Sequence, residues 1–147
     1  MVDILHRIGV QGPTPEKVYD ALTTPEGLAG WWTEDTKGSG GVGDVLAFRF
    51  PNGGFDMEVV DSRPAERVTW RVVDGPAEWI GTTIDWRLQQ VGDWTIVLFA
   101  HGGWAEPVEF MHHCSTKWAT FLVSLKSLLE TGEGAPAPRD LPISDWH

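Results

Sequence analysis

The segment PVEFMHHCSTKWATFLVSLKSLLE, residues 107–130, decides the fold of this chain, because it carries the longest helical pattern in the sequence. Its apolar residues recur at three- and four-residue spacing, which places them on one face of an α-helix. The stripe consists of Phe110, Cys114, Trp118, Phe121, Leu125 and Leu128, widened by Met111, Leu122 and Leu129. A helix of roughly 24 residues is about 36 Å long, and Gly132 suits its C-cap. The pattern therefore predicts one long C-terminal helix.

Short strand patterns occupy most of the chain ahead of this helix. Each alternates apolar with polar residues and ends at a turn rich in Gly, Pro, Asn or Asp. We expect strands near residues 3–12, 45–50, 55–61, 68–72, 80–90 and 94–101. Consecutive strands joined by short turns form an antiparallel meander. The inward face of the last strand stays open, since Ile96 and Leu98 compete with Val97 and Phe99 for it.

Two helix starts follow the first strand. Thr14-Pro15-Glu16 and Thr24-Pro25-Glu26 each combine a good N-cap, a proline suited to the first turn and an acidic residue that complements the helix dipole. The Gly-rich stretch Lys37–Asp44 is expected to be a loop. This order predicts an α+β domain, in which a curved antiparallel sheet of six to seven strands wraps around the long helix. Because a helix fills a curled sheet only in part, we expect a cavity between them.

The composition narrows the class of protein. The chain has 147 residues with a formal net charge of -10, from 21 acidic and 11 basic side chains. Such a surface repels phosphate backbones and anionic lipids, so neither nucleic-acid binding nor membrane docking is expected. Cys114 is the only cysteine, which precludes an internal disulfide and favours the cytoplasm. The Pro-rich residues 133–147 are expected to form a loose tail.

An ordered series of short motifs resembles one known superfamily. The motifs are PEKVYDAL at 15–22, WW at 31–32, GGVGD at 40–44, PAERV at 64–68, TIVL at 95–98 and HGGW at 101–104. Together they are similar to the START-related, birch-pollen-allergen-like superfamily (SRPBCC). Within it they most resemble the bacterial branch named for homology to the C-terminal domain of the heat-shock-protein ATPase activator. The resemblance implies a helix-grip fold and a ligand-binding domain over residues 1–132, because superfamily members bind apolar ligands and some are polyketide cyclases or related enzymes.

Tryptophan is the strongest functional signal in the sequence. Nine Trp residues are unusual, and rigid aromatic walls with a few polar tips suit a planar or hydrophobic ligand. The residues that we expect to line the pocket are Phe48, Met57, Trp70, Trp86, His101, Trp118 and Phe121. Trp31, Trp32 and Trp104 are expected in loops around its opening. Any one of these residues alone is better explained as core, but the set has more bulk and more N–H groups than a plain core requires. The sequence therefore favours a binder of a small hydrophobic or aromatic molecule.

Catalysis is the main alternative to binding alone. A histidine in an apolar pocket has its charged form disfavoured and can serve as an acid or base. His101, His112 and His113 are therefore the candidates in a polyketide-cyclase-like enzyme. Cys114 lies on the apolar stripe, where a cysteine is usually an inert small hydrophobe. A third hypothesis is an interaction module that acts as a chaperone cofactor, and the chain is expected to be a monomer or a homodimer.

Neither a metal nor a nucleotide cofactor is expected. Glu109 with His112 or His113 has the helical spacing of two ligands, but no HExxH or CxxC motif accompanies them. Residues 38–43 match the pattern GxGxxG. A dinucleotide site needs a strand before this pattern and a helix after it, whereas here a strand follows.

Overall fold

The computed structural model describes residues 1–147 and has the expected α+β architecture. In chain order the elements are β1 (Val2–Gln11), α1 (Pro15–Thr23), α2 (Pro25–Trp31), β2 (Asp35–Gly38), β3 (Val45–Phe50), β4 (Gly53–Arg63), β5 (Arg67–Asp74), β6 (Thr83–Val91), β7 (Trp94–Trp104) and α3 (Glu109–Thr131). All strand pairs are antiparallel and form one seven-stranded sheet of order β1-β7-β6-β5-β4-β3-β2. The helix-grip prediction is confirmed, including both short helices after the first strand.

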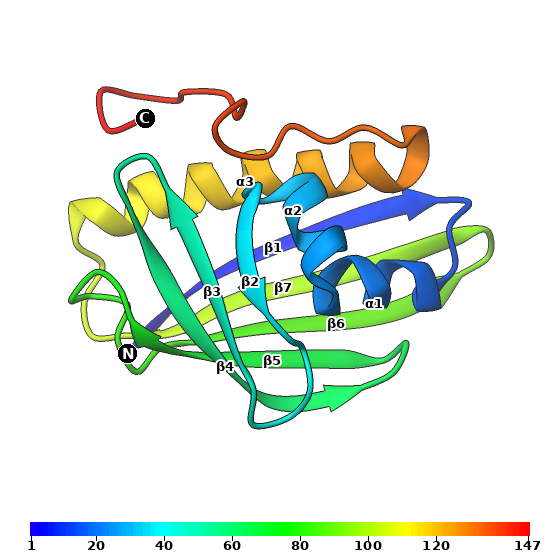
Figure 1. Cartoon of the computed structure of the whole chain (residues 1–147), viewed down its shortest axis with the longest axis horizontal. Helices are drawn as coiled ribbons and strands as arrows, with labels where there is room; N and C mark the ends of the chain where they lie inside the picture. The colour runs from blue at the N-terminus through cyan, green and yellow to red at the C-terminus, as the bar shows by residue number, and fades with distance from the viewer.

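The sheet curls around one side of α3 (Figure 1). Irregular registers at Val2/Ile4 in β1, and at Asp56/Met57 and Val59/Asp61 in β4, contribute to this curvature, because a β-bulge bends its strand and increases the local twist. The one strand that the sequence did not predict is β2, which lies partly within the Gly-rich stretch that we expected to be a loop. It is a four-residue edge strand with no apolar side chain, so alternation could not reveal it.

The core lies between the concave face of the sheet and the three helices. Residues of β3 to β7 point into it in alternation, as the period of a strand requires: Leu46, Phe48, Met57, Val59, Val68, Trp70, Val72, Ile84, Trp86, Val97 and Phe99. The face of β7 that the sequence left open is thereby settled. Val97 and Phe99 are buried on the concave face, whereas Leu98 is 40% exposed on the outer face, where Ile96 is 7% exposed.

Helix α3 buries the stripe read from the sequence. Cys114, Trp118, Phe121 and Leu125 of that stripe are buried. The helix ends at Gly132, whose φ of 89° is left-handed and suits glycine. Neither α3 nor any shorter helix combines the length and apolarity that a membrane crossing requires.

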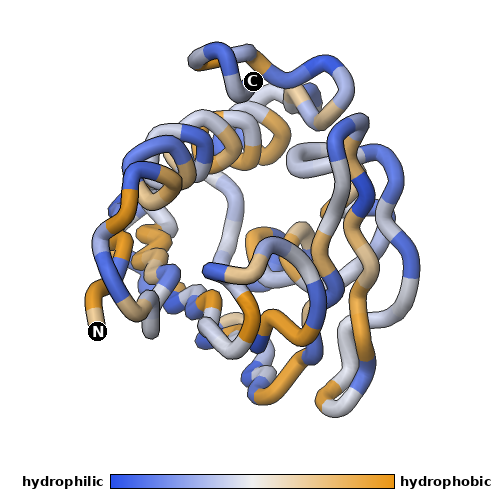
Figure 2. Tube along the Cα trace, turned by 90° about the vertical axis from the view of Figure 1, so that its left-hand side faces the viewer, coloured by the Kyte–Doolittle hydropathy of each residue, from blue (hydrophilic) through white to orange (hydrophobic).

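The C-terminal segment, residues 133–147, is packed rather than loose. Ser124 of α3 donates a hydrogen bond to the carbonyl oxygen of Trp31 (2.8 Å) and accepts one from the backbone N–H of Ala135 (2.7 Å). Ala137 is buried and pairs with Thr33 in a parallel bridge. The segment then runs alongside α3 toward the tip of the β3–β4 hairpin, as both views of the chain show (Figures 1 and 2). The expectation of a loose tail is wrong here, because the backbone N–H groups of Ala135 and Ala137 donate to Ser124 and to the carbonyl oxygen of Trp32.

Candidate functional site

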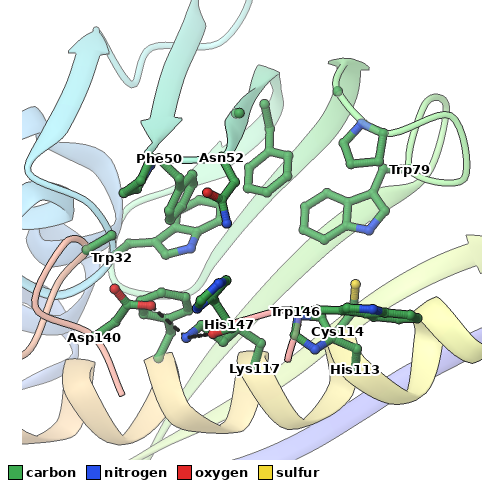
Figure 3. A pocket seen from close by; sticks show the side chains of 18 of the residues that line it. Trp32, Phe50, Asn52, Trp79, His113, Cys114, Lys117, Asp140, Trp146 and His147 are labelled. Carbon is green, nitrogen blue, oxygen red and sulfur yellow. Dashed lines mark hydrogen bonds and ion pairs between the residues drawn. The ribbon is translucent and has the colours of Figure 1, made fainter. Parts of the chain in front are cut away.

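A cavity of about 800 Å³ opens between α3 and the curled end of the sheet. Five parts of the chain surround it: the inner face of α3, the β3–β4 hairpin, the loop between β5 and β6, the C-terminal segment, and Trp32 at the end of α2. Figure 3 shows side chains from these parts pointing toward one another across the space. Its volume lies within the range of pockets that take small organic ligands, roughly 300–1,000 Å³.

Eight of the 23 residues that line the cavity are phenylalanines or tryptophans. Trp32, Trp79, Trp118 and Phe121 are buried at its base, while Phe50, Phe55 and Phe110 are half-buried around it. Trp79 stacks on Phe55, with ring centroids 4.2 Å apart and planes 16° apart, and lies nearly parallel to Trp118 at 6.0 Å. Parallel rings give the cavity flat walls, which favour planar or hydrophobic molecules.

Two weakly polar groups lie in the aromatic wall. The indole N–H of Trp79 is buried and has no hydrogen-bond partner. It faces the sulfur of Cys114 (Figure 3), and this contact slightly favours the thiolate. Burial raises the pKa of the Cys114 thiol to about 12, so the sulfur is a neutral thiol at physiological pH. A nucleophilic cysteine needs a lowered pKa, which this position does not give.

Lys117 is the only lysine or arginine among the residues that line the cavity. Its ammonium group lies 2.6 Å from a carboxylate oxygen of Asp140. It also donates to the main-chain oxygens of Leu141 (2.8 Å) and His147 (2.6 Å). The side chains of Lys117 and Asp140 are only 16% and 18% exposed. An ammonium group has three donors, and each of them here has an acceptor.

His113 lies beside this ion pair, one turn of α3 before Lys117. Its ring stacks on Phe110 (6.2 Å between centroids) and meets the edge of Trp146 (5.6 Å). Burial and the neighbouring charge of Lys117 lower the pKa of His113, an effect that Asp145 partly offsets. His113 is therefore mostly neutral at physiological pH.

His101 lies behind the wall rather than in it. The indole N–H of Trp118 donates to Nδ1 of His101 (3.1 Å), so the ring proton belongs on Nε2, which donates to the Thr82 hydroxyl (2.8 Å). Thr82 in turn donates to the carbonyl oxygen of Trp79 (2.5 Å). Burial lowers the pKa of His101 to about 3. Both ring nitrogens are thus used within the fold, and this chain of hydrogen bonds positions Trp118 and Trp79.

The structure separates the residues predicted from the sequence into two groups. Trp118, Phe121 and His113 line the cavity. Phe48, Met57, Trp70, Trp86 and His101 are buried without lining it, and His112 is exposed on α3. Of the three tryptophans expected at the opening, Trp32 lines the cavity, whereas Trp31 and Trp104 are buried elsewhere. The four apolar residues of the second group belong to the buried core cluster, which extends along the sheet beyond the cavity.

Sequence reasoning missed several residues of the wall. They are Phe50, Phe55, Trp79, Phe110, Lys117, Asp140 and Trp146. Phe50 and Phe55 flank the turn of one predicted hairpin, so their common end of the sheet could have been inferred. Lys117 and Asp140 are 23 residues apart and pair only because the C-terminal segment turns back over α3. No group of three or more His, Cys, Asp or Glu side chains is arranged to hold a metal ion.

Comparisons with known proteins agree with this architecture. Residues 13–130 match the family model described as Activator of Hsp90 ATPase homolog 1-like protein. No curated protein matches the chain. Among solved structures, the Aha1 dimer from Colwellia psychrerythraea is 48% identical, with a TM-score of 0.85, over 91% of this chain and 100% of that one.

Two more distant structures share the fold. CalU16 from Micromonospora echinospora is 22% identical with a TM-score of 0.71, over 92% of this chain and 77% of that one. DynU16, a putative protein in the dynemicin biosynthetic locus, is 24% identical with a TM-score of 0.70, over 90% of this chain and 49% of that one. At these identities the likeness extends to the fold alone.

Proposed function

The chain belongs to the family of Activator of Hsp90 ATPase homolog 1-like proteins, and from this premise we propose that it binds a small hydrophobic or aromatic molecule between the sheet and α3. The observation that carries the proposal is the aromatic cavity of about 800 Å³. Apolar walls with a small number of polar groups are the usual composition of a small-molecule site.

The state of the titratable groups supports binding rather than catalysis. Cys114 is a neutral thiol, and both nitrogens of His101 have protein partners. Lys117 has an acceptor for each of its donors. A general base must reach the proton that it removes, and a nucleophile must be activated by a neighbouring group. Of the three candidate histidines, only His113 lines the cavity. Its one hydrogen-bond partner is the Ser144 hydroxyl, 3.3 Å from Nδ1.

A fluorescence titration with N-phenyl-1-naphthylamine, an uncharged aromatic probe, tests the binding function. We expect saturable binding of one probe per chain. Trp79→Ala should weaken it about tenfold or more, because a wall ring that stacks on the probe is lost. Trp94→Ala is the matched control, since Trp94 is not part of this cavity. Circular dichroism checks that both variants are folded. An absence of saturable binding, or equal affinity of the folded Trp79→Ala variant, would refute the proposal.

A second candidate is activation of a chaperone ATPase, which the family description suggests. The 48% identity to a protein named Aha1 is the observation that favours it. A fold alone is a weak basis for a function. The measurement is the ATPase rate of an Hsp90 chaperone with and without equimolar protein. An unchanged ATPase rate would rule out this second function and would not affect the proposal of ligand binding in the cavity.

We also propose that the chain forms a homodimer, as its 48% identical relative does. The outer face of the sheet carries two exposed leucines on neighbouring strands, Leu5 (70% exposed) on β1 and Leu98 (40% exposed) on β7. A second copy of the chain would cover them. Sedimentation of the wild type should give twice the mass of one chain, and Leu98→Asp should give the mass of one chain. Val123→Asp, which changes an exposed residue of α3, is the control and should remain a dimer. A monomeric wild type would rule the homodimer out.

A further inference from the structure

Lys117 is the only ammonium group among the residues that line the cavity, and all three of its acceptors come from the C-terminal segment. The sheet and the remainder of α3 supply none. The aromatic ring of Phe121 lies below the ammonium group, with 5.3 Å from nitrogen to ring centroid. Any movement of the C-terminal segment away from the cavity would therefore leave a mostly buried cation without an anionic partner.

The C-terminal segment places an aromatic ring and oxygen acceptors at the mouth of the cavity, where a ligand would also bind. Trp146 lays an aromatic ring against Phe110 (6.4 Å between centroids) and against His113 (5.6 Å). The next residue, His147, places its main-chain oxygen on Lys117, and Asp140 adds a carboxylate. Figure 3 shows these groups converging at the edge of the cavity. The mouth of the cavity thus binds an aromatic ring and an anionic oxygen next to each other.

We infer that the cavity takes an aromatic molecule bearing one anionic group, and that this anion replaces the oxygens of the C-terminal segment on Lys117. The inference rests on the binding function proposed above. An uncharged ligand that displaced the segment would leave the ammonium unpaired, which is costly for a buried charge. An anionic ligand restores a charge-assisted hydrogen bond. Lys117 also offsets the repulsion that a chain of net charge -10 exerts on any anion.

Two probes that share one scaffold separate the charge from the apolar contact. Both 8-anilinonaphthalene-1-sulfonate and N-phenyl-1-naphthylamine carry the anilinonaphthalene rings, and only the first has a sulfonate. We expect Lys117→Met to weaken binding of the sulfonate about tenfold or more and to leave binding of the uncharged probe within about twofold. Lys17→Met, on the exposed face of α1, removes the same charge away from the cavity and should change neither affinity.

Asp140→Asn tests the replacement of the segment's oxygens on Lys117 by removing the competing carboxylate rather than the lysine. Loss of the competing carboxylate should tighten sulfonate binding about threefold more than it tightens binding of the uncharged probe. If the uncharged probe binds but Lys117→Met leaves the ratio of the two affinities unchanged, the inference is wrong and the binding function stands. If neither probe binds, the binding function itself fails. Should Lys117→Met not fold, an unchanged ratio in Asp140→Asn overturns the inference alone.

Discussion

Trp86 and Trp79 are both buried tryptophans, yet one belongs to the core and the other to the cavity wall. Trp86 is 0% exposed and has aromatic neighbours on several sides, with ring centroids of Trp31, Trp70 and Phe99 within 5.6 Å. Trp79 is 4% exposed and stacks on Phe55, while its surroundings include the cavity. Low exposure is therefore common to core and wall residues. What distinguishes them is whether the chain itself supplies neighbours on every side.

The indole N–H groups sharpen the comparison. Neither Nε1 of Trp86 nor Nε1 of Trp79 has a hydrogen-bond partner. In the core this is a fixed cost, since no group can reach the donor, and packing of the large ring offsets it. In the wall the indole N–H faces the sulfur of Cys114, a weak acceptor that offsets part of this cost. The two buried donors thus differ in their surroundings rather than in their exposure.

The largest expected effect is on stability, in the core. Trp86→Ala should lower the free energy of unfolding by about 3–5 kcal/mol, because it leaves a large void where helix and sheet are in contact. Urea unfolding followed by circular dichroism measures the change. A loss below about 1 kcal/mol would mean that Trp86 is not a core residue and would remove the distinction from Trp79.

A smaller effect is expected from His101, which joins the core to the wall. Its pKa is about 3 in the fold and 6.5 when unperturbed, so the unfolded chain binds the proton more readily. The stabilisation is fully present above pH 6.5 and is lost as the pH falls toward 3, at about 1.4 kcal/mol per unit. Between pH 7 and pH 5 the loss should be about 2 kcal/mol.

Urea unfolding of the wild type and of His101→Gln at both pH values checks this loss. The glutamine variant should lose clearly less between pH 7 and pH 5, although it is less stable throughout. Since His113 also has a lowered pKa, a small slope should remain in the variant. Equal slopes in the two proteins would show that His101 does not set the acid sensitivity.

The smallest effect on stability is expected in the wall. Phe110 is half-buried at the mouth of the cavity, so Phe110→Ala should cost only about 1 kcal/mol of unfolding free energy. The same change should weaken binding of N-phenyl-1-naphthylamine about fivefold or more, since a ring that contacts the probe is removed. A core-like loss of stability with unchanged probe affinity would place Phe110 in the core instead.

The sequence was sufficient for the fold because the fold depends on periodicity. Alternation predicted the inward faces of Trp70 and Trp86, and the helical stripe predicted Trp118 and Phe121, all of which are buried as expected. Two consecutive Thr-Pro-Glu signals predicted α1 and α2. Only β2 was not predicted, because it has no apolar face.

The cavity was harder to predict because periodicity reports the face of an element and not the depth along it. Met57 and Phe55 share one face of β4, yet Met57 is fully buried in the core while Phe55 lines the cavity. The pairing of Lys117 with Asp140 depends on the path of a segment that has no periodic pattern. A Pro-rich composition suggested disorder there, whereas backbone hydrogen bonds to Ser124 and Trp32 hold the segment in place.

The position of β1 at one edge of the sheet has a consequence for how the chain folds. Its only strand partner is β7, so Val2 pairs with Trp104, although the two are separated by about a hundred residues. On the ribosome, the first strand must therefore wait unpaired until nearly the whole sheet has been made. Closing such a long loop is entropically costly and slows the search for the native topology. We expect the β2–β6 meander to form early, and the docking of β1 against β7 to be the late, rate-limiting event.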